Sequence, residues 1–174
     1  MTQDHESLTT LRHLLDYDAS KFTTAEIRLK SSLHDWIAKA SSLKLKGVLQ
    51  RYIDFVQRHI QTMEGFFEEE KMNSLNINNR VMEAFIEDTD EKISFCTSAA
   101  MKDACLLACV QAINHYKIST YGTAAAFSNA LGMEKYAAVF HEAEVNEKQI
   151  DDRLSQLAEH EINPEANKPI AVEQ

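Results

Sequence analysis

The sequence has few of the residues that interrupt a helix, with only 4 glycines and 2 prolines among 174 residues. Both prolines, Pro164 and Pro169, lie in the last dozen residues, so no proline breaks a helix before them. This scarcity, together with abundant Ala, Leu, Glu and Lys, predicts an all-helical protein. The length is sufficient for one domain with a sizeable core.

Basic residues are also scarce, and the formal net charge is −9 at pH 7. Nucleic acids and anionic membranes bind basic surfaces, so we expect neither of them as the main partner. No apolar run reaches the roughly 18 residues of a membrane-spanning helix. The polar start from Met1 to Leu8 does not resemble a signal peptide. We therefore expect a cytoplasmic protein.

Three cysteines, Cys96, Cys105 and Cys109, do not form a disulfide framework. Their small number agrees with the reducing environment of the cytoplasm. Cys105 and Cys109 lie one turn apart on one predicted helix, a spacing that also suits two thiolates on a metal ion. The interpretation we favour is that they are small buried side chains.

Apolar residues spaced three and four apart predict four long helices and a shorter one. The long helices are predicted at residues 7–39, 43–71, 101–131 and 134–161. The shorter helix is predicted at 80–95, after an Asn- and Ser-rich segment, 73–79, that is typical of a loop. Gly132 has the position expected of a residue that ends the third long helix.

The lengths of the connections indicate how these helices are arranged. Short turns join the first two long helices and the last two, whereas about 30 residues, including the short helix, connect the two pairs. We predict an all-α, ferritin-like four-helix bundle with a long middle crossover. The bundle is expected at residues 1–161 and a disordered tail at 162–174. Periodicity alone does not exclude a plain up-down bundle.

Seven polar residues interrupt the apolar seams of the long helices, each near the middle of its helix. They are Glu26, Tyr52, His59, Asn114, Lys117, Tyr121 and Glu147. Because all four helices contribute, we expect these residues to meet at one level of the bundle as a polar core cluster. A buried lysine needs an acidic partner, so we predict that Lys117 pairs with Glu147, Glu26 or both.

Carboxylates and histidines in this position bind iron or manganese in di-metal proteins. The complete ligand set has one Glu from each of two helices and a Glu-x-x-His motif from each of the other two. Here only Glu26, Glu147 and His59 have suitable positions, so we predict that no cofactor is bound. If a metal binds, these three residues are its predicted ligands, because three protein ligands suffice for one ion. Iron or manganese is the alternative expectation.

The segment Lys102 to Glu159 resembles the second half of the YciF/YciE-type ferritin-like proteins of bacteria. The run HYKISTYGTA at 115–124 is similar to that family's HYEIAAYGTA signature. In the first half, AEIRL and ASSLKLKGVL resemble the family's AEKQL and ASSPELK stretches. The resemblance covers most of residues 8–160. A second register would instead match the segment around Asp18 to the family's YDAEK.

This resemblance implies a bundle that is commonly dimeric, has a carboxylate di-metal site in some members, and is associated with bacterial stress responses. In the first register, Glu26 matches the glutamate of the first helix. The glutamates that flank HY in the family's EHYE pattern are Asn114 and Lys117 here. In the second helix Asp54 retains an acid, and Phe55 replaces one. The resemblance therefore implies a degenerate di-metal site.

Three functions remain open from the sequence. The one we favour is a non-enzymatic, stress-associated homodimer with a metal-free polar core. Contact with an unknown protein partner is a further expectation. The second is a di-iron or di-manganese oxidoreductase, or an iron-handling protein, with an unusual ligand set. The third is a single-metal site formed by Glu26, His59 and Glu147, with Asn114 as a weak ligand. Nucleophilic catalysis has no support, because no Ser or Cys lies at a turn motif beside a base.

Overall fold

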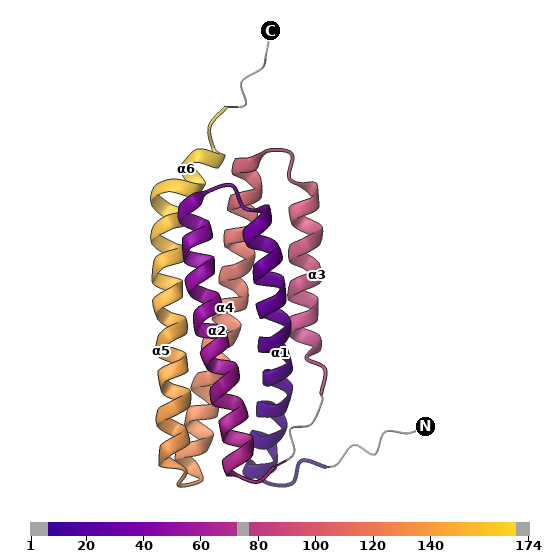
Figure 1. Cartoon of the computed structure of the whole chain (residues 1–174), viewed down its shortest axis with the longest axis vertical. Coiled ribbons are helices and arrows are strands. Elements are labelled where there is room, and N and C mark those ends of the chain that lie inside the picture. The colour runs from indigo at the N-terminus through magenta and orange to yellow at the C-terminus, as the bar shows by residue number, and fades with distance from the viewer. Residues whose placement is uncertain (1–6, 73–76, 170–174) are drawn as a thin grey trace, which may run out of the picture.

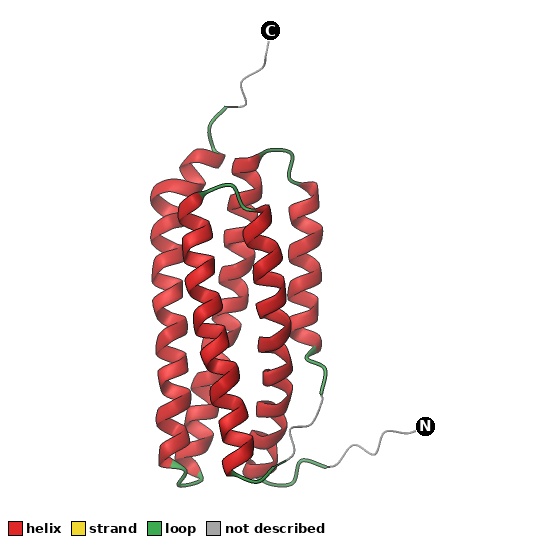
Figure 2. Ribbon diagram, viewed as in Figure 1, coloured by secondary structure: helices red, strands yellow, loops and turns green. Residues whose placement is uncertain are grey.

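The computed structural model describes residues 7–72 and 77–169, and within these residues the chain is helical without strands (Figures 1 and 2). The helices are α1 Leu11–Lys39, α2 Leu43–Glu69, α3 Arg80–Phe95, α4 Ala99–Ala130 and α5 Glu134–Leu157. A π-helical turn, η1 at Ala158–Ile162, and a single turn, α6 at Asn163–Ala166, continue α5. None of the helices in the described residues has the length and apolar character needed to cross a membrane.

The four long helices, α1, α2, α4 and α5, form the bundle. The hairpins α1–α2 and α4–α5 pack against each other through α2 with α5 and through α1 with α4. Figure 1 shows that α2 ends at one end of the bundle, α3 returns along the outside, and α4 starts at the other end. The connection therefore crosses the length of the bundle, which confirms the predicted ferritin-like architecture and excludes a plain up-down bundle.

The helix ends follow local sequence signals. Ser42 accepts a hydrogen bond from the backbone of Leu45 and caps α2, and Asn79 and Ser98 cap α3 and α4 in the same way. Gly132, with a φ of 71°, lies in the turn after α4, where glycine avoids steric strain. Part of the predicted loop at 73–79, residues 73–76, lies outside the described residues.

Helix α3 is fixed to the outside of the bundle by polar contacts as well as by apolar packing. The Trp36 indole of α1 donates a 2.9 Å hydrogen bond to Asp90 of α3. At the start of α3, the Asn79 side chain donates a 3.1 Å hydrogen bond to the hydroxyl of Tyr116 on α4. These contacts hold the crossover against the α1–α4 side of the bundle.

The structure corrects the expected start of the tail at residue 162. Helical structure continues to Ala166, and Ile162 is buried against the end of the bundle. Pro164 does not prevent this, because it directly follows the π-helical turn η1, where the regular i→i−4 hydrogen bonding of the helix is already interrupted. Of the predicted tail, residues 170–174 lie outside the described residues.

Asp103 connects the two hairpins at the end of the bundle where α2 begins. Its two carboxylate oxygens each accept a 2.8 Å hydrogen bond, one from the backbone N–H of Ser41 and one from that of Ser42. The side chain is only 5% exposed. This role has no signal in the sequence, because the partners lie about 60 residues away.

We expect Asp103→Ala to lower the free energy of unfolding by about 2–3 kcal/mol, since it removes the charged acceptor of two backbone N–H groups, those of Ser41 and Ser42. Urea denaturation measures the change. Asp103→Asn is the matched control, because it retains one acceptor oxygen and should lose less stability. A loss below about 0.5 kcal/mol for the alanine variant, as at an ordinary surface position, would contradict this role.

Candidate functional site

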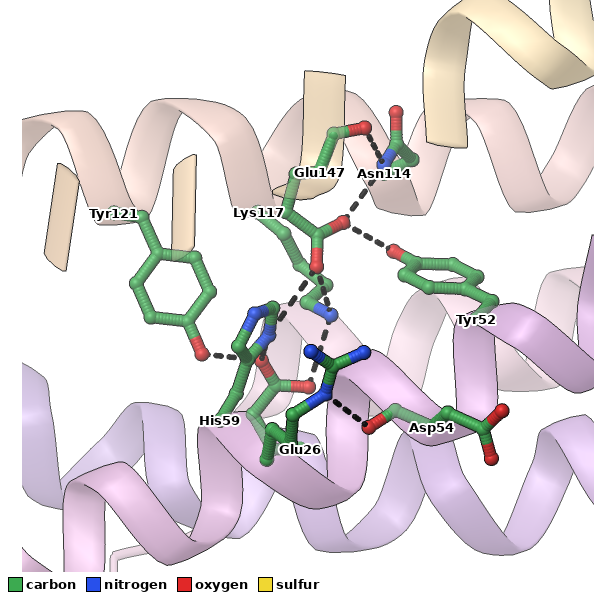
Figure 3. Close-up of polar contacts among 9 residues, drawn as sticks. Glu26, Tyr52, Asp54, His59, Asn114, Lys117, Tyr121 and Glu147 are labelled. Atoms are coloured by element: carbon green, nitrogen blue, oxygen red, sulfur yellow. Dashed lines mark hydrogen bonds and ion pairs between the residues drawn. The ribbon is translucent and has the colours of Figure 1, made fainter. Parts of the chain in front are cut away.

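The structure brings the seven sequence-predicted polar residues together in the interior of the bundle (Figure 3). We call them the central cluster, and none of them is more than 3% exposed. Its members are Glu26 from α1, Tyr52 and His59 from α2, Asn114, Lys117 and Tyr121 from α4, and Glu147 from α5. Every long helix therefore contributes to one buried polar site.

Lys117 is the central member of the cluster. Its Nζ lies 3.0 Å from Oε2 of Glu26 and 2.5 Å from Oε1 of Glu147, so one ammonium bridges carboxylates from α1 and α5. The same Nζ lies 4.6 Å from the centre of the Tyr52 ring, whose face attracts a cation. The side chains of all three ionic residues are fully buried. Their attraction is therefore screened little by water.

Hydrogen bonds fix the remaining oxygens of the two carboxylates. Oε2 of Glu147 accepts a 2.6 Å bond from the Tyr52 hydroxyl and a 2.7 Å bond from Nδ2 of Asn114. Oε1 of Glu26 accepts a 2.5 Å bond from the Tyr121 hydroxyl. Each carboxylate thus has an ammonium on one oxygen and a neutral donor on the other, as a buried charge requires.

His59 lies between the two carboxylates. Its Nδ1 is 3.5 Å from Oε1 of Glu26 and 3.5 Å from Oε1 of Glu147, and neither ring nitrogen makes a hydrogen bond within the described residues. The ring packs edge-on against Tyr121 at 4.9 Å and parallel to Phe55 at 6.4 Å. The formal charges of two carboxylates and one ammonium leave one net negative charge beside this imidazole.

The electrostatic balance of the cluster favours an ionised Glu26 and neutral tyrosines. Burial alone would raise the pKa of Glu26, but the charge of Lys117, together with His59 and Tyr121, holds it below its ordinary value. Burial and the adjacent carboxylates raise the pKa values of Tyr52 and Tyr121 well above that of a free tyrosine. Both phenols are therefore hydrogen-bond donors at neutral pH.

The ligand set for a metal is incomplete. Glu26, His59 and Glu147 each offer an atom within 4.8 Å of the others, which suffices for one ion. Asp54 does not add to them, because it lies exposed on α2 and points away from the cluster (Figure 3). A pair of metals normally needs about six protein ligands. The residues present do not fit a di-metal centre, and a single ion would have to displace the ammonium of Lys117.

Access to the central cluster from solvent is limited. A cavity of about 240 Å³ lies between α1 and α4, where its lining includes Asp18, Phe22 and Tyr116. Within the described residues, Tyr121 is the one cluster member that lines it. A molecule in this cavity would therefore meet the Tyr121 ring before any ionic group of the cluster.

A four-helix bundle with a long crossover and inward-facing carboxylates defines a ferritin-like protein. The family described as a domain of unknown function, DUF892, matches residues 10–167 of this chain, and the chain belongs to that family. This confirms the YciF-type resemblance found in the sequence.

Two comparisons with one relative, in sequence and in structure, show how far the similarity extends. Protein YciF of Escherichia coli (strain K12) is 28% identical over 163 residues, which cover 92% of this chain and 97% of YciF. The crystal structure of the E. coli stress protein YciF matches with a TM-score of 0.84 and 26% identity, over 90% of this chain and 99% of that one.

A solved structure from another organism shares the fold. YcfI from Rhodopseudomonas palustris matches with a TM-score of 0.84 over 88% of this chain and 98% of that chain. At 22% identity this similarity concerns the fold alone.

Proposed function

We propose that this is a non-enzymatic, stress-associated ferritin-like protein in which Lys117 takes the place of the metal charge in the bundle core. The observation that carries the proposal is the position of the Lys117 Nζ, 3.0 Å from Glu26 and 2.5 Å from Glu147 with no exposure to solvent. The Lys117 ammonium neutralises part of the negative charge of these two carboxylates, which a bound metal ion would otherwise neutralise. The association with stress comes from the similarity to the E. coli stress protein YciF.

The non-enzymatic part of the proposal follows from the chemistry of the cluster. Its carboxylates are bound to an ammonium and to phenols, so neither is available as a free base. The phenols remain protonated because burial and the carboxylates raise their pKa values. A buried ionic group of this kind specifies which helix faces meet, and we propose that its role is structural. We further propose a cytoplasmic homodimer, as expected from the sequence and its family resemblance.

A single-metal site is the alternative, favoured by the grouping of Glu26, His59 and Glu147 within 4.8 Å. Iron or manganese would suit two carboxylates and one imidazole. Such an ion and the Lys117 ammonium exclude each other, because both need the same carboxylate oxygens.

Elemental analysis of untagged protein, expressed with supplemented iron and manganese, separates the two functions. We expect near-zero iron and manganese and no binding of Fe²⁺ or Mn²⁺ on titration, because the ammonium already holds both carboxylates. About one ion per chain, lost in Glu26→Ala and Glu147→Ala, would establish the single-metal site instead. About two ions per chain would show that groups outside the cluster also act as ligands.

A further inference from the structure

The cavity of about 240 Å³ between α1 and α4 lies beside the central cluster and shares Tyr121 with it. Helix α3 packs against α1 and α4 along the upper part of Figure 1, and the cavity begins where α3 begins, because the α3 cap Asn79 lines it. Met63 of α2 and Phe140 of α5 line its buried side. Small-ligand sites in proteins have volumes of about 300–1,000 Å³, so this cavity suits a ligand near the small end of that range.

The inner wall of the cavity is aromatic. The buried rings of Phe22, Tyr121 and Phe140 all contribute to it. Phe22 packs edge-on against Tyr121, with the ring centres 5.0 Å apart, and edge-on against Tyr116, at 5.9 Å. Aromatic rings favour such edge-to-face contacts, and a ring placed in the cavity can make them with the same wall. The inner wall therefore suits an aromatic or a large apolar group.

Two charged residues of α1, Asp18 and Lys21, also line the cavity. Both are half-buried, and in residues 7–72 and 77–169 neither side chain makes a hydrogen bond or a direct ion pair. Burial raises the pKa of the Asp18 carboxyl above its ordinary value, although the charge of Lys21 acts in the opposite direction. The carboxylate would therefore gain from a cationic partner, and the ammonium of Lys21 would gain from an anionic one.

We propose that this cavity binds a free amino acid whose side chain is aromatic or large and apolar. The ammonium of the ligand pairs with Asp18 and its carboxylate pairs with Lys21, while its side chain packs against the aromatic inner wall. Residues three apart on a helix have Cβ atoms about 5–6 Å apart, so both can reach the two charges of one amino acid. The charges favour a zwitterion, because Lys21 repels a simple amine and Asp18 repels a simple carboxylate.

The test is isothermal titration calorimetry of the full-length protein with L-phenylalanine, 2-phenylethylamine and 3-phenylpropanoate. The second compound lacks the carboxylate of phenylalanine, and the third lacks its ammonium. We expect L-phenylalanine to bind with a Kd below about 1 mM. Each analogue should bind about 10-fold more weakly, because it loses one charge-assisted hydrogen bond. Glycine has both charges but no side chain for the inner wall, so it should not bind.

Two variants assign the charged contacts. Asp18→Asn should weaken the binding of L-phenylalanine about 10-fold without weakening that of 3-phenylpropanoate, which has no ammonium to lose. Lys21→Gln should weaken the binding of L-phenylalanine to a similar extent without weakening that of 2-phenylethylamine. Asp35→Asn, an exposed change on α1 outside the cavity lining, is the matched control and should bind like the parent. Circular dichroism confirms that each variant is folded.

Three results would overturn the proposed amino-acid site. They are no binding of L-phenylalanine, equal binding of L-phenylalanine and 2-phenylethylamine, and unchanged affinity for L-phenylalanine in Asp18→Asn. The second result would assign the cavity to a simple cation instead. Iron or manganese in the purified protein would contradict the metal-free core without affecting this site.

Discussion

Lys117→Met is expected to lower the free energy of unfolding by about 3–5 kcal/mol, because it strands two buried carboxylates without their counter-charge. Methionine is similar to lysine in length and shape. The loss of stability therefore results from the missing charge more than from a change in side-chain volume. For a chain of this length the change corresponds to a fall of about 6–20 °C in melting temperature. Denaturant and thermal unfolding, followed by circular dichroism, give both quantities.

Lys148→Met is the matched control for this substitution. Lys148 is 54% exposed and pairs with Glu144 on the surface of α5, so its loss should change stability by no more than about 0.5 kcal/mol. If Lys117→Met melts within a degree of the parent, the ammonium does not hold the carboxylates and the proposed role of Lys117 is wrong.

The dependence on pH distinguishes a lost charge pair from a packing defect. In the parent protein the pKa of Glu26 is depressed, so the stability that its pairing contributes is present at neutral pH. That contribution is lost as the pH falls from the ordinary glutamate value of 4.5 through the lower folded value. Lys117→Met lacks the ammonium that depresses this pKa, so it has no such contribution to lose. The difference in stability between the two proteins should therefore shrink below about pH 4.5, whereas a cavity would cost the same at every pH.

Much of the fold was predictable because the signals that fix it are local. The structure has α3 at Arg80–Phe95, the predicted range, since its ends are set by the adjacent loop and by Asn79. The exception at the C-terminus arose because Pro164 follows a π-helical turn that continues α5, so this proline did not mark the end of the bundle. The connectivity of the helices was predictable only from the length of the crossover, because periodicity alone left two topologies open.

The central cluster was predictable as a set of residues but not as a set of bonds. Helical phase indicated that Lys117 faces inward, and its charge required acidic partners. Phase left open whether the ammonium pairs with one carboxylate or with both, and it did not reveal that Tyr52 and Tyr121 each donate to a different one. These pairings depend on how far each helix is displaced along the bundle. The contact of Asp103 with the start of α2 also depends on this displacement, so it was not predictable from the sequence either.

If Lys117 replaces the charge of a metal, exchanging it for a carboxylate should make the protein depend on one. The family pattern that the HYKISTYGTA segment resembles has glutamate at this position, and the Lys117 side chain already lies between Glu26 and Glu147. Lys117→Glu would create three carboxylates beside His59, a set of hard oxygen donors and one imidazole that suits Mn²⁺. Without metal, like charges in a buried site repel, so this variant should be less stable than Lys117→Met.

We expect Mn²⁺ to raise the melting temperature of Lys117→Glu by about 5–10 °C, because ligand at 100 times its dissociation constant adds about 2.7 kcal/mol. The parent should show no such shift, since its ammonium occupies the same oxygens. Lys148→Glu adds a carboxylate on the surface of α5 and serves as the control, again without a shift. Thermal unfolding with and without Mn²⁺ measures all three proteins. A Mn²⁺ shift in the parent would show that the lysine does not exclude metal, and its absence in Lys117→Glu would show that these side chains do not form a cation site.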